Sequence, residues 1–394
     1  MQTVVLAAGS GTRLRPFTET QPKPTLPVAG RPLICHTLSA AVAAGASRLV
    51  VVVNPNTDAV QRAVGDRVAG VDVEYVTQTE QRGTADAVAA AADSLEDAPF
   101  VVLNGDALYD EPSLADLYGS APAVGSFRVS DPGSYGVLHT EGERVTGVVE
   151  KPENPASDLV NAGAYALPAV VRSWLDVPES ERGELEFTDV LNRVCGEVEV
   201  GTVEFERWLD VGRAWDLLAA NEWKVEETGP RVEGEVSEDA VLSEHTYVAP
   251  GAEVRSGVVI DGPAYIDSNA TVGPNAYIRG TTYVGPEAKV GHAVEVKNSV
   301  LMAGATVGHL AYVGDSLLGQ DVNFGAGTKV ANLRHDGGDV KLTVKGERVS
   351  TGRRKFGVVC GDGTKTGINT SLNAGVTLST GASTTPGEVV TRDR

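Results

Sequence analysis

The sequence is poor in cysteine and aromatic residues and has no long apolar run. It holds 3 Cys, 7 Phe, 4 Trp and 6 His among 394 residues. Cys35, Cys195 and Cys360 are scattered, so they predict neither a disulfide framework nor a zinc site. No apolar stretch approaches the ~18 residues of a membrane-spanning helix, and the first residues lack the basic region and the cleavage site of a signal peptide. We therefore expect a cytoplasmic protein without a membrane partner.

Basic residues are also scarce relative to acidic ones. The chain has 53 Asp and Glu against 33 Lys and Arg, a formal net charge of −20. Residues 1–229 hold 35 acids and 17 bases, whereas residues 230–394 hold 18 and 16. So acidic a chain repels the phosphates of a polymer, which argues against a nucleic-acid partner. Such a surface suits a high-salt cytoplasm that screens self-repulsion, although an ordinary acidic mesophile protein is the alternative.

The composition changes near residue 229. The part after it holds 25 of the 45 glycines and none of the four tryptophans. Residues 226–230, Glu-Glu-Thr-Gly-Pro, have the composition of a linker. A chain of this length is long enough for two domains with separate cores. We predict a domain over residues 1–229 and another over residues 230–394.

A six-residue repeat of apolar residues dominates the second part. Every sixth position from 236 to 302 is apolar, and the pattern continues from 307 to 324 with two steps of five residues. This period predicts short strands stacked into a parallel β-helix. Glycines follow several of these positions, as at Gly273, Gly285 and Gly291, where we expect tight corners that need a positive φ. A polar and basic insertion at about residues 331–356 interrupts the coils.

Residues 1–229 alternate between short apolar runs and helical patterns. The runs at residues 3–7, 49–53, 73–76 and 100–103 predict buried parallel strands, and residues 33–44, 58–64 and 84–95 predict helices. The alternation predicts an open α/β sheet that binds ligands at the carboxyl ends of its strands. A glycine loop at residues 9–14 follows the first strand, but it lacks the third glycine of a dinucleotide fingerprint and the Gly-Lys-Ser/Thr of a P-loop.

The residues around this loop carry a family resemblance. Residues 6–16, Leu-Ala-Ala-Gly-Ser-Gly-Thr-Arg-Leu-Arg-Pro, and Gln-Pro-Lys-Pro at 21–24 resemble the signature loop of sugar-1-phosphate nucleotidylyltransferases. The resemblance implies a Rossmann-like (GT-A-like) domain in which a sugar-1-phosphate attacks the α-phosphate of a nucleoside triphosphate and releases pyrophosphate. Arg13 and Lys23 would be catalytic, since they neutralise the charge that develops on the phosphates. The nucleotide, UTP or dTTP, would be bound by Leu6, Ala8, Gly9, Gly11, Thr12, Gln78, Gly83 and Thr84.

Further motifs extend the resemblance over the whole first part. Asn-Gly-Asp at 104–106 and Trp-Leu-Asp-Val-Gly at 208–212 resemble the family's metal motifs, which implies that Asp106 and Asp210 hold Mg²⁺. Tyr-Gly-Val at 135–137, Glu-Lys-Pro at 150–152 and Asn-Ala-Gly-Ala-Tyr at 161–165 resemble its sugar-phosphate pocket. The residues implied there are Gly136, Glu150, Lys151 and Asn161.

The repeat resembles the left-handed β-helix of hexapeptide-repeat acyltransferases. Residues 307–315, 323–328 and 332–336 resemble the acetyltransferase half of bifunctional GlmU-type enzymes, and residues 352–355 and 361–369 look most like its archaeal members. The resemblance implies that His309 takes a proton from the amine of glucosamine-1-phosphate as it attacks acetyl-CoA. Tyr312 would stabilise the oxyanion. Sugar-phosphate contacts are implied for Lys297, Asn323, Asn332 and Lys341, and coenzyme A contacts for Arg353, Arg354 and Lys355, with Arg348 nearby.

These resemblances leave more than one function open. The first is a bifunctional enzyme that acetylates glucosamine-1-phosphate and then uridylylates it. The second is a monofunctional glucose-1-phosphate thymidylyl- or uridylyltransferase whose β-helix only assembles subunits. The third, an inactive scaffold, is disfavoured by the intact set Arg13, Lys23, Asp106 and Asp210. In either enzyme we expect a homotrimer, and the acidity together with the archaeal-like motifs favours a halophilic archaeon as the source.

Overall fold

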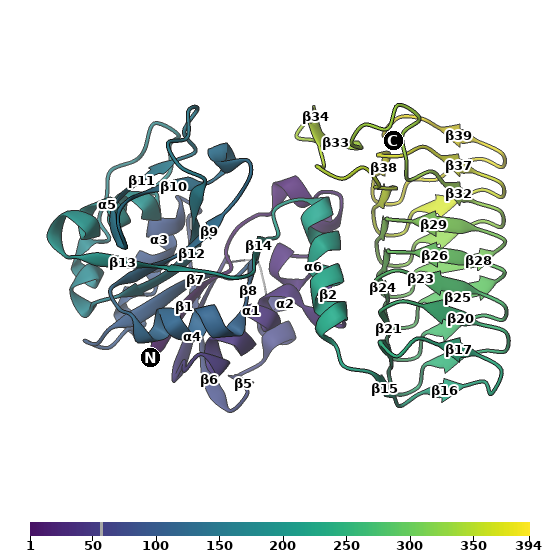
Figure 1. Cartoon of the computed structure of the whole chain (residues 1–394), viewed down its shortest axis with the longest axis horizontal. Helices are drawn as coiled ribbons and strands as arrows, with labels where there is room; N and C mark the ends of the chain where they lie inside the picture. The colour runs from purple at the N-terminus through teal and green to yellow at the C-terminus, as the bar shows by residue number, and fades with distance from the viewer. Residues whose placement is uncertain (56–57) are drawn as a thin grey trace. The chain divides into compact units, whose positions relative to one another are not determined.

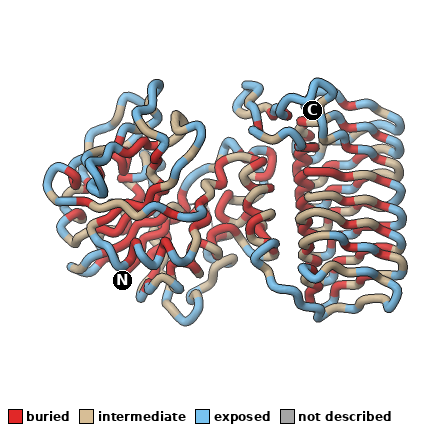
Figure 2. The backbone as a smooth tube through the Cα atoms, in the orientation of Figure 1, coloured by how far each residue is buried: buried red, intermediate tan, exposed pale blue. Residues whose placement is uncertain are grey.

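The chain folds into two compact units, and the structure, a computed structural model, describes residues 1–55 and 58–394. The first unit comprises Met1–Ser10, Pro22–Thr25 and Pro32–Asp210, and the second comprises Gly11–Gln21, Leu26–Arg31 and Val211–Arg394. Each unit has its own buried core, drawn in red in Figure 2. Within the described residues no helix is both long and apolar enough to cross a membrane. The domain boundary between residues 229 and 230 stays a prediction.

A mixed sheet of ten strands lies at the centre of the first unit (Figure 1). Its strands follow the order β10-β11-β13-β9-β12-β7-β1-β4-β6-β5. Strands β7, β1, β4 and β6 run parallel to one another, as the apolar runs predict. The strands are β1 (Gln2–Leu6), β4 (Arg48–Val53), β5 (Arg67–Val68), β6 (Val71–Thr77), β7 (Phe100–Asn104), β9 (Ala123–Arg128), β10 (Gly136–Glu141), β11 (Arg144–Glu150), β12 (Leu159–Leu167) and β13 (Val200–Glu204).

Alternate residues of the parallel strands face two separate cores. Val5 and Val51 belong to the core that includes residues of α1 and α4, whereas Val4 and Val50 belong to the core that includes residues of α3 and α5. Strands β1, β4 and β7 are largely apolar because helices cover both faces of the sheet there, whereas β6 carries Asp72 and Glu74 and is only partly buried. The helices of this unit are α1 (Leu33–Ala43), α2 (Asp58–Val64), α3 (Thr84–Ala90), α4 (Glu111–Gly119) and α5 (Phe187–Glu197).

The predicted helices are confirmed except at one end. Helices α1 and α2 lie at the predicted residues, but α3 ends at Ala90 instead of residue 95. The chain tightens there into a 3-10 turn, Ala92–Ser94, and Ser94 Oγ donates to Glu74 Oε1 of β6 at 2.5 Å. Helix ends commonly tighten in this way, and the prediction that the helix continues to residue 95 is wrong.

Most of the second unit is a parallel β-helix, which confirms the predicted fold class (Figure 1). Its strands contribute in turn to three parallel sheets, and each strand pairs with a strand one coil away, as Ile260 does with Ile278. The first sheet contains β15 (Arg231–Val232), β18 (Thr246–Val248), β21 (Ala264–Ile266), β24 (Thr282–Val284), β27 (Val300–Leu301), β30 (Leu317–Leu318), β35 (Val359–Cys360) and β38 (Thr377–Leu378).

The other two sheets complete the coils. One contains β16 (Glu235–Val236), β19 (Glu253–Val254), β22 (Thr271–Val272), β25 (Lys289–His292), β28 (Thr306–His309), β31 (Asn323–Phe324) and β36 (Lys365–Thr366). The other contains β17 (Val241–Leu242), β20 (Val259–Asp261), β23 (Tyr277–Arg279), β26 (Glu295–Lys297), β29 (Tyr312–Gly314), β32 (Lys329–Val330), β37 (Ser371–Leu372) and β39 (Val389–Val390).

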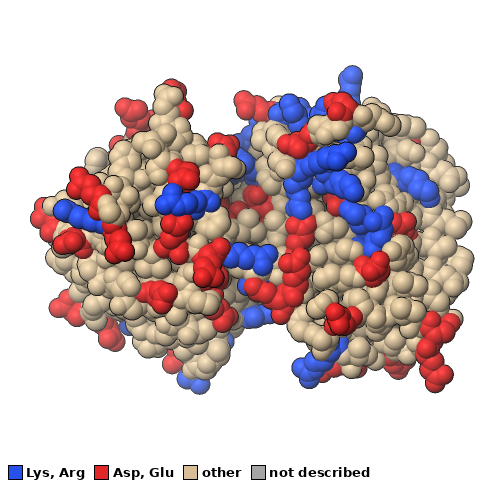
Figure 3. All heavy atoms as spheres, in the orientation of Figure 1, with Lys and Arg blue, Asp and Glu red and all other residues tan. Residues whose placement is uncertain are grey.

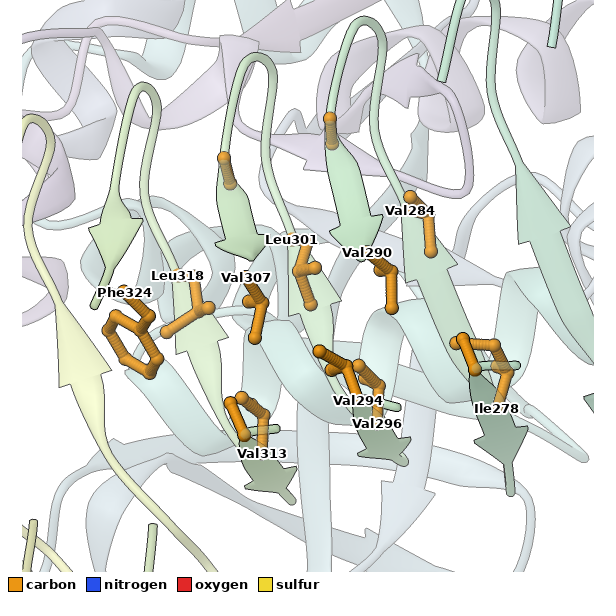
Figure 4. Packing of buried hydrophobic residues seen from close by; sticks show 14 of the residues in the cluster. Ile278, Val284, Val290, Val294, Val296, Leu301, Val307, Val313, Leu318 and Phe324 are labelled. Carbon is orange, nitrogen blue, oxygen red and sulfur yellow. The ribbon is translucent and has the colours of Figure 1, made fainter. Parts of the chain in front are cut away.

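The apolar residues of the six-residue steps point into the β-helix, with Leu301 in place of Met302. Figure 4 shows these side chains stacked in rows from Ile278 to Phe324. All of those labelled there are almost fully buried. Because each coil buries its aliphatic residues only against its neighbours, the repeat forms one continuous core. The six-residue period therefore predicts most of this core correctly, but it is wrong at Met302, because Leu301 stacks between Val284 and Leu318 instead.

The glycines of the repeat act differently from the prediction. Gly273 has the expected left-handed φ of 102°, but Gly285 and Gly291 lie outside the left-handed region. A Cβ at Gly291 would lie 1.8 Å from the carbonyl oxygen of Gly308 in the next coil. Glycine is needed there because the coils stack closely, so the predicted positive φ is wrong at these two positions. Some left-handed corners are instead formed by asparagine, as at Asn298, a residue that tolerates this conformation.

The last coils remain regular although polar residues replace aliphatic ones. Strands β35 and β38 pair in parallel, as do β37 and β39. The buried hydroxyl groups of Thr328 and Thr366 lie 2.8 Å apart, and those of Thr370 and Thr384 are also 2.8 Å apart. These hydroxyl pairs satisfy each other inside the coil, which lets threonine take the place of aliphatic residues.

The insertion predicted at residues 331–356 lies between β32 and β35. It contains an antiparallel hairpin, β33 (Lys341–Val344) and β34 (Glu347–Ser350). Val340, Leu342 and Phe356 are buried and anchor it. Lys and Arg side chains gather around this hairpin on the face shown in Figure 3. The insertion is therefore an ordered basic element of the second unit.

Helix α6 (Ala214–Glu227) also belongs to the second unit, where it packs on β21 and β24. Asn221 of α6 accepts a hydrogen bond from the backbone N–H of Ala29 at 2.9 Å and donates to the carbonyl oxygen of Pro27 at 3.2 Å. A Cβ at Gly30 would lie 2.5 Å from the hydroxyl oxygen of Tyr265. The segment Leu26–Arg31 is thus fixed between α6 and the β-helix.

Candidate active sites

A cavity of about 280 Å³ is lined by residues at the carboxyl ends of β1 and β7. Leu6 ends β1 and pairs with Asn104, which ends β7. Open α/β sheets bind ligands at this edge. Asp106, a predicted metal ligand, lines the cavity too. The predicted nucleotide-binding residues that line it are Leu6, Ala8, Gly9, Gln78, Gly83 and Thr84.

Lys23 and Asp106 form an ion pair in the first unit. Lys23 Nζ lies 2.5 Å from Asp106 Oδ2, and the side chains are 7% and 33% exposed. Strand β8 (Ala107–Tyr109) follows Asp106 directly and pairs antiparallel with β14 (Trp208–Asp210). Asp210 lies opposite Ala107 in this pairing. The fold therefore brings the two predicted metal ligands, Asp106 and Asp210, to neighbouring positions on adjacent strands.

Two carboxylates on adjacent strands fit a magnesium ion that is shared with a substrate. Proteins commonly bind Mg²⁺ through one or two carboxylates and leave its other positions to phosphate oxygens and water. Among residues 1–55 and 58–394 there is no group of three or more His, Cys, Asp or Glu able to hold a metal ion. The oxygen donors of Asp106 and Asp210 are of the type that Mg²⁺ prefers.

Gln78 is held at the edge of the cavity by the segment that starts α3. Its Nε2 donates to the carbonyl oxygen of Gly83 at 3.0 Å and to Asp86 Oδ2 at 2.8 Å. Gly83 has a φ of 132°, and a Cβ there would lie 2.3 Å from the carbonyl oxygen of Leu185. This is a position that only glycine occupies without strain. The side chain of Gln78 is therefore fixed, with 4% of the residue exposed.

The predicted sugar-phosphate residues lie on three neighbouring strands. Gly136 of β10 pairs with Glu150 of β11, and β10 also pairs with β12, which carries Asn161. Lys151 Nζ lies 3.2 Å from Glu150 Oε1. Asn161 is engaged internally, since its Nδ2 donates to the Tyr165 hydroxyl at 2.6 Å and its Oδ1 accepts from the Gly163 N–H at 2.9 Å. The structure thus gathers this set.

Tyr165, the partner of Asn161, is buried. Burial raises the pKa of its hydroxyl above the ordinary value. The phenol therefore stays protonated and remains a fixed partner for the Asn161 amide.

Gly11, Thr12 and Arg13 belong to the second unit. Gly11 has a left-handed φ of 61° and precedes a 3-10 turn, Thr12–Leu14. Its carbonyl oxygen accepts hydrogen bonds from the Leu14 N–H and from Thr18 Oγ1, both at 2.9 Å. Arg13 is exposed. The loop that follows β1 is thus a rigid turn with an accessible arginine.

Three predicted residues of the β-helix meet around one buried carboxylate. Lys297 Nζ lies 2.8 Å from both carboxylate oxygens of Asp315. Asn332 Nδ2 donates to Asp315 Oδ2 at 2.5 Å and to the Tyr312 hydroxyl at 3.2 Å. The structure therefore brings Lys297, Tyr312 and Asn332 together on adjacent coils. Burial also raises the pKa of Tyr312 above its ordinary value, which keeps its hydroxyl protonated as a donor.

His309 ends β28 at an exposed corner of the same coils. It pairs in register with His292 of β25, one coil earlier. Its carbonyl oxygen accepts from the Gly327 N–H at 2.9 Å, and Lys329 Nζ donates to the carbonyl oxygen of Leu310. The backbone of this corner is thus fixed, while the imidazole is exposed to solvent.

The remaining predicted residues are more dispersed. Asn323 lies on β31 and Lys341 on β33, both exposed. Arg353 forms an ion pair with Glu222 of α6 and donates to the carbonyl oxygen of Trp215 at 3.4 Å. The two cationic residues after it, Arg354 and Lys355, are exposed.

Sequence reasoning missed several residues that share these sites. Arg182 Nη2 lies 3.5 Å from Glu150 Oε1 and 2.5 Å from Glu186 Oε2, so it adds a positive charge beside Lys151. Gln81 and Glu184 also line the cavity. Glu184 lies about a hundred residues from Gln81, and no local pattern relates them. Asp315 stands inside the motif at 307–315, but the motif alone does not indicate its role.

The fold and these two sites define a class of protein, a nucleotidyl transferase unit combined with a hexapeptide-repeat β-helix. The family model described as nucleotidyl transferase matches residues 2–227, and the one described as GMPPB C-terminal domain matches residues 260–360. The chain is 37% identical, over 100% of its own length and 98% of the relative's, to the bifunctional sugar-1-phosphate nucleotidylyltransferase/acetyltransferase of Sulfurisphaera tokodaii. It is 35% identical to the bifunctional protein GlmU of Methanococcus vannielii, over 95% of its length and 91% of the relative's.

A solved structure is also similar to part of the chain. A Bacillus anthracis protein, provisionally described as a glucose-1-phosphate thymidylyltransferase and solved with a sucrose, is 27% identical with a TM-score of 0.52. The match covers 57% of this chain and 94% of that one. The chain therefore belongs to the family of bifunctional sugar-1-phosphate nucleotidylyltransferase/acetyltransferases.

Proposed function

We propose that this chain acetylates glucosamine-1-phosphate from acetyl-CoA and transfers a uridylyl group from UTP to N-acetylglucosamine-1-phosphate, releasing pyrophosphate. The observation that most supports acetyl transfer is the cluster of Lys297, Tyr312 and Asn332 around Asp315. A β-helix that only assembled subunits would not need a buried ion pair at this corner. Nucleotidyl transfer is supported by the cavity that Gln78 and Asp106 line.

In nucleotidyl transfer the residues bind and orient the substrates for an in-line displacement. Gln78, whose Nε2 is engaged by Gly83 and Asp86, would accept the N3–H of uracil at its amide oxygen. Arg13 and Lys23 would neutralise the charge that develops on the triphosphate. The backbone of the loop containing Gly9, Gly11 and Thr12 would wrap the phosphates, with Leu6, Ala8 and Thr84 beside the base.

The sugar-1-phosphate would lie on the β10–β12 side of this unit. Glu150 would accept hydrogen bonds from sugar hydroxyls, Gly136 and Asn161 would contact the sugar or its N-acyl group, and Lys151 would pair with the phosphate. Asp106 and Asp210 would hold Mg²⁺, which supplies charge neutralisation between the phosphate oxygens when it is bound.

In acetyl transfer the amine attacks the thioester carbonyl and coenzyme A leaves as the thiolate. His309 would take a proton from the amine. The Tyr312 hydroxyl accepts from Asn332, so its own O–H can donate to the oxyanion. The sugar phosphate would be held by Lys297, Asn323, Asn332 and Lys341, and the phosphates of coenzyme A by Arg353, Arg354 and Lys355.

The two activities can be separated by substitution. The purified chain is assayed for coenzyme A release with glucosamine-1-phosphate and for pyrophosphate release with UTP or dTTP and several sugar phosphates. His309→Ala should lose coenzyme A release and keep pyrophosphate release, and Asp106→Asn should show the reverse. Failure of the parent to release coenzyme A, or equal loss of both activities in His309→Ala, would contradict the two-site proposal. Full activity of Asp106→Asn would contradict the metal assignment.

A second candidate is a monofunctional glucose-1-phosphate thymidylyl- or uridylyltransferase. The likeness of the first part to the Bacillus anthracis structure favours it. The same assay distinguishes the two, because this candidate requires pyrophosphate release from glucose-1-phosphate without any coenzyme A release.

Assembly and location complete the proposal. We infer a homotrimer, since closed symmetry is usual for such oligomers and a β-helix offers long flat faces for it. Light scattering coupled to size-exclusion chromatography tests the trimer, and a monomer would contradict it. Cys35, Cys195 and Cys360 are free and buried, which is compatible with a reducing cytoplasm.

A further inference from the structure

Asp315 is a buried carboxylate surrounded by donors. The residue is 3% exposed. Oδ1 accepts from Lys297 Nζ at 2.8 Å and from Asn298 Nδ2 at 3.1 Å, and Oδ2 accepts from Lys297 Nζ at 2.8 Å and from Asn332 Nδ2 at 2.5 Å. Lys297, Asn298 and Asn332 therefore all donate to one side chain that is itself sealed from solvent.

We propose that Asp315 is a positioning residue of the acetyl-transfer site, and that its carboxylate fixes Lys297 and Asn332 to receive the phosphate of the amino sugar. This inference rests on the proposed acetyl transfer. At 5% side-chain exposure Asp315 is too enclosed to meet the substrate, whereas Lys297 is 17% exposed. Lys297 directs at most two of its three N–H groups at the carboxylate, so at least one remains for an anion.

The chemistry of the cluster requires an acceptor-only group at position 315. A carboxylate offers lone pairs on both oxygens to the ammonium and the two amides. An asparagine there would turn one N–H group toward Lys297 or Asn332, so one of these donors would lose its acceptor. Removing one partner of a buried ion pair is costly because the other charge is left uncompensated.

The fold itself tolerates asparagine at this corner. Asp315 has a left-handed φ of 51°, and Asn298, at the same corner one coil earlier, has a φ of 46°. The Asp315 N–H donates to the carbonyl oxygen of Lys297, just as the Asn298 N–H donates to that of Arg279. The chain thus already uses asparagine at this corner, so Asp315→Asn changes the hydrogen-bond chemistry and preserves the backbone.

Asp321→Asn is the matched control. Asp321 has a left-handed φ of 54° at another corner of the β-helix and is exposed. Both variants remove one negative charge and place asparagine in the same backbone conformation. The two aspartates differ in their hydrogen bonds. In the part of the chain that the structure describes, Asp315 accepts from Lys297 and Asn332, and Asp321 does not.

The experiment measures coenzyme A release by the full chain at varied glucosamine-1-phosphate and varied acetyl-CoA. Asp315→Asn should raise KM for glucosamine-1-phosphate roughly tenfold or more, as losing a residue that orients a ligand commonly does. KM for acetyl-CoA and the rate of pyrophosphate release should stay unchanged, which shows that the variant is folded. Asp321→Asn should change none of these values.

A double variant tests whether the effect passes through Lys297. In Lys297→Met the substitution Asp315→Asn should raise KM much less than it does in the parent, because the contact it breaks is already gone. An unchanged KM for glucosamine-1-phosphate in Asp315→Asn, or fully additive effects in the double variant, overturns the inference alone. A parent chain that releases no coenzyme A overturns the proposed acetyl transfer and the inference with it.

Discussion

At the residue scale, two lysine–aspartate pairs among the described residues differ in exposure, and this difference fits the roles proposed for them. Asp106 beside Lys23 is 33% exposed, whereas Asp315 beside Lys297 is 5% exposed. An accessible carboxylate can exchange a lysine for a metal ion that arrives with phosphate. A sealed one cannot, because leaving Lys297 without its counter-charge costs too much. The exposed pair of Lys23 and Asp106 therefore suits the proposed catalytic role, and the buried pair of Lys297 and Asp315 suits the proposed positioning role.

Tyr312 carries a prediction about pH at this scale. Burial raises its pKa above the ordinary value of a tyrosine, so its O–H persists as a donor at alkaline pH and is lost only when the pH exceeds that raised value. We therefore expect any alkaline decline in coenzyme A release that comes from this group to begin at a higher pH than an ordinary tyrosine would give. Tyr312→Phe should lower kcat by roughly 100-fold or more, the usual cost of one oxyanion donor.

The control for this prediction is Tyr277→Phe. Tyr277 occupies the same register position two coils earlier, through the pairs Tyr277–Glu295 and Glu295–Tyr312. It should leave kcat unchanged. A Tyr312→Phe variant with full kcat would exclude the phenol as an oxyanion donor.

At the element scale, both units depend on close backbone approaches that only glycine permits. Gly83 lets the start of α3 lie against Leu185, and the Ala85 N–H then donates to the carbonyl oxygen of Leu185 at 2.9 Å. Gly291 lets one coil of the β-helix lie against the next. In each case the missing Cβ sets the spacing between two elements, and side chains beside them are positioned as a result.

Gly83→Ala should impair nucleotidyl transfer selectively. The new Cβ would force Leu185 away and shift the carbonyl oxygen that holds Gln78. We expect KM for UTP to rise roughly tenfold or more in a pyrophosphate-release assay, with coenzyme A release unchanged. Gly119→Ala at the end of α4, where a Cβ meets nothing within 4 Å, is the control. Equal KM values for UTP in the two variants would contradict a role for the close contact between Gly83 and Leu185.

Leu318→Ala should destabilise the β-helix. Leu318 is fully buried in β30 and stacks between Leu301 and Cys360 of neighbouring coils. Truncating a buried leucine costs about 2–5 kcal/mol, which corresponds to a fall in Tm of about 4 °C or more for a unit of this size. Calorimetry measures it, and Val241→Ala, at a side chain that is 59% exposed, should shift Tm little. Equal shifts would show that the stacked rows do not carry the stability.

At the scale of the whole molecule, the charge of −20 sits mostly in residues 1–229, which contribute 35 acids and 17 bases. That part nonetheless binds triphosphate in the proposed function, so its anion site depends on local cations such as Lys23 against a repulsive background. Self-repulsion of this kind lowers the stability of the folded state unless salt screens it.

Thermal unfolding should therefore depend on salt. Raising KCl from about 0.1 M to about 1 M shortens the Debye length from about 10 Å to about 3 Å. We expect Tm to rise over this range and then to level off, as measured by calorimetry. A Tm that is flat or falls between these concentrations would contradict the interpretation of the chain as halophilic.

Much of this organisation follows from the sequence, and the failures have local causes. The six-residue period predicts the β-helix because each coil repeats the same contacts with its neighbours. The apolar runs predict the parallel strands because helices bury both faces of the sheet. The end of α3 and the role of Gly291 were missed because they depend on neighbouring elements, Glu74 of β6 and Gly308 of the next coil. Glu184 and Asp315 were missed because their partners come from segments that are distant in the sequence, and local residue spacing does not indicate such contacts.

The discontinuous second unit has a consequence for synthesis of the chain. Thr20 Oγ1 donates to Asp362 Oδ2 at 2.6 Å, and Thr380 Oγ1 donates to Glu19 Oε2 at 3.0 Å, across 342 and 361 residues of sequence. A ribosome adds about 5–20 residues per second, so residues 11–21 of the nascent chain wait roughly 20–70 s for these partners. Residues 11–21 are synthesised early, but they can form these contacts only after the last coils have been synthesised. The second unit is therefore completed only when both ends of the chain are present.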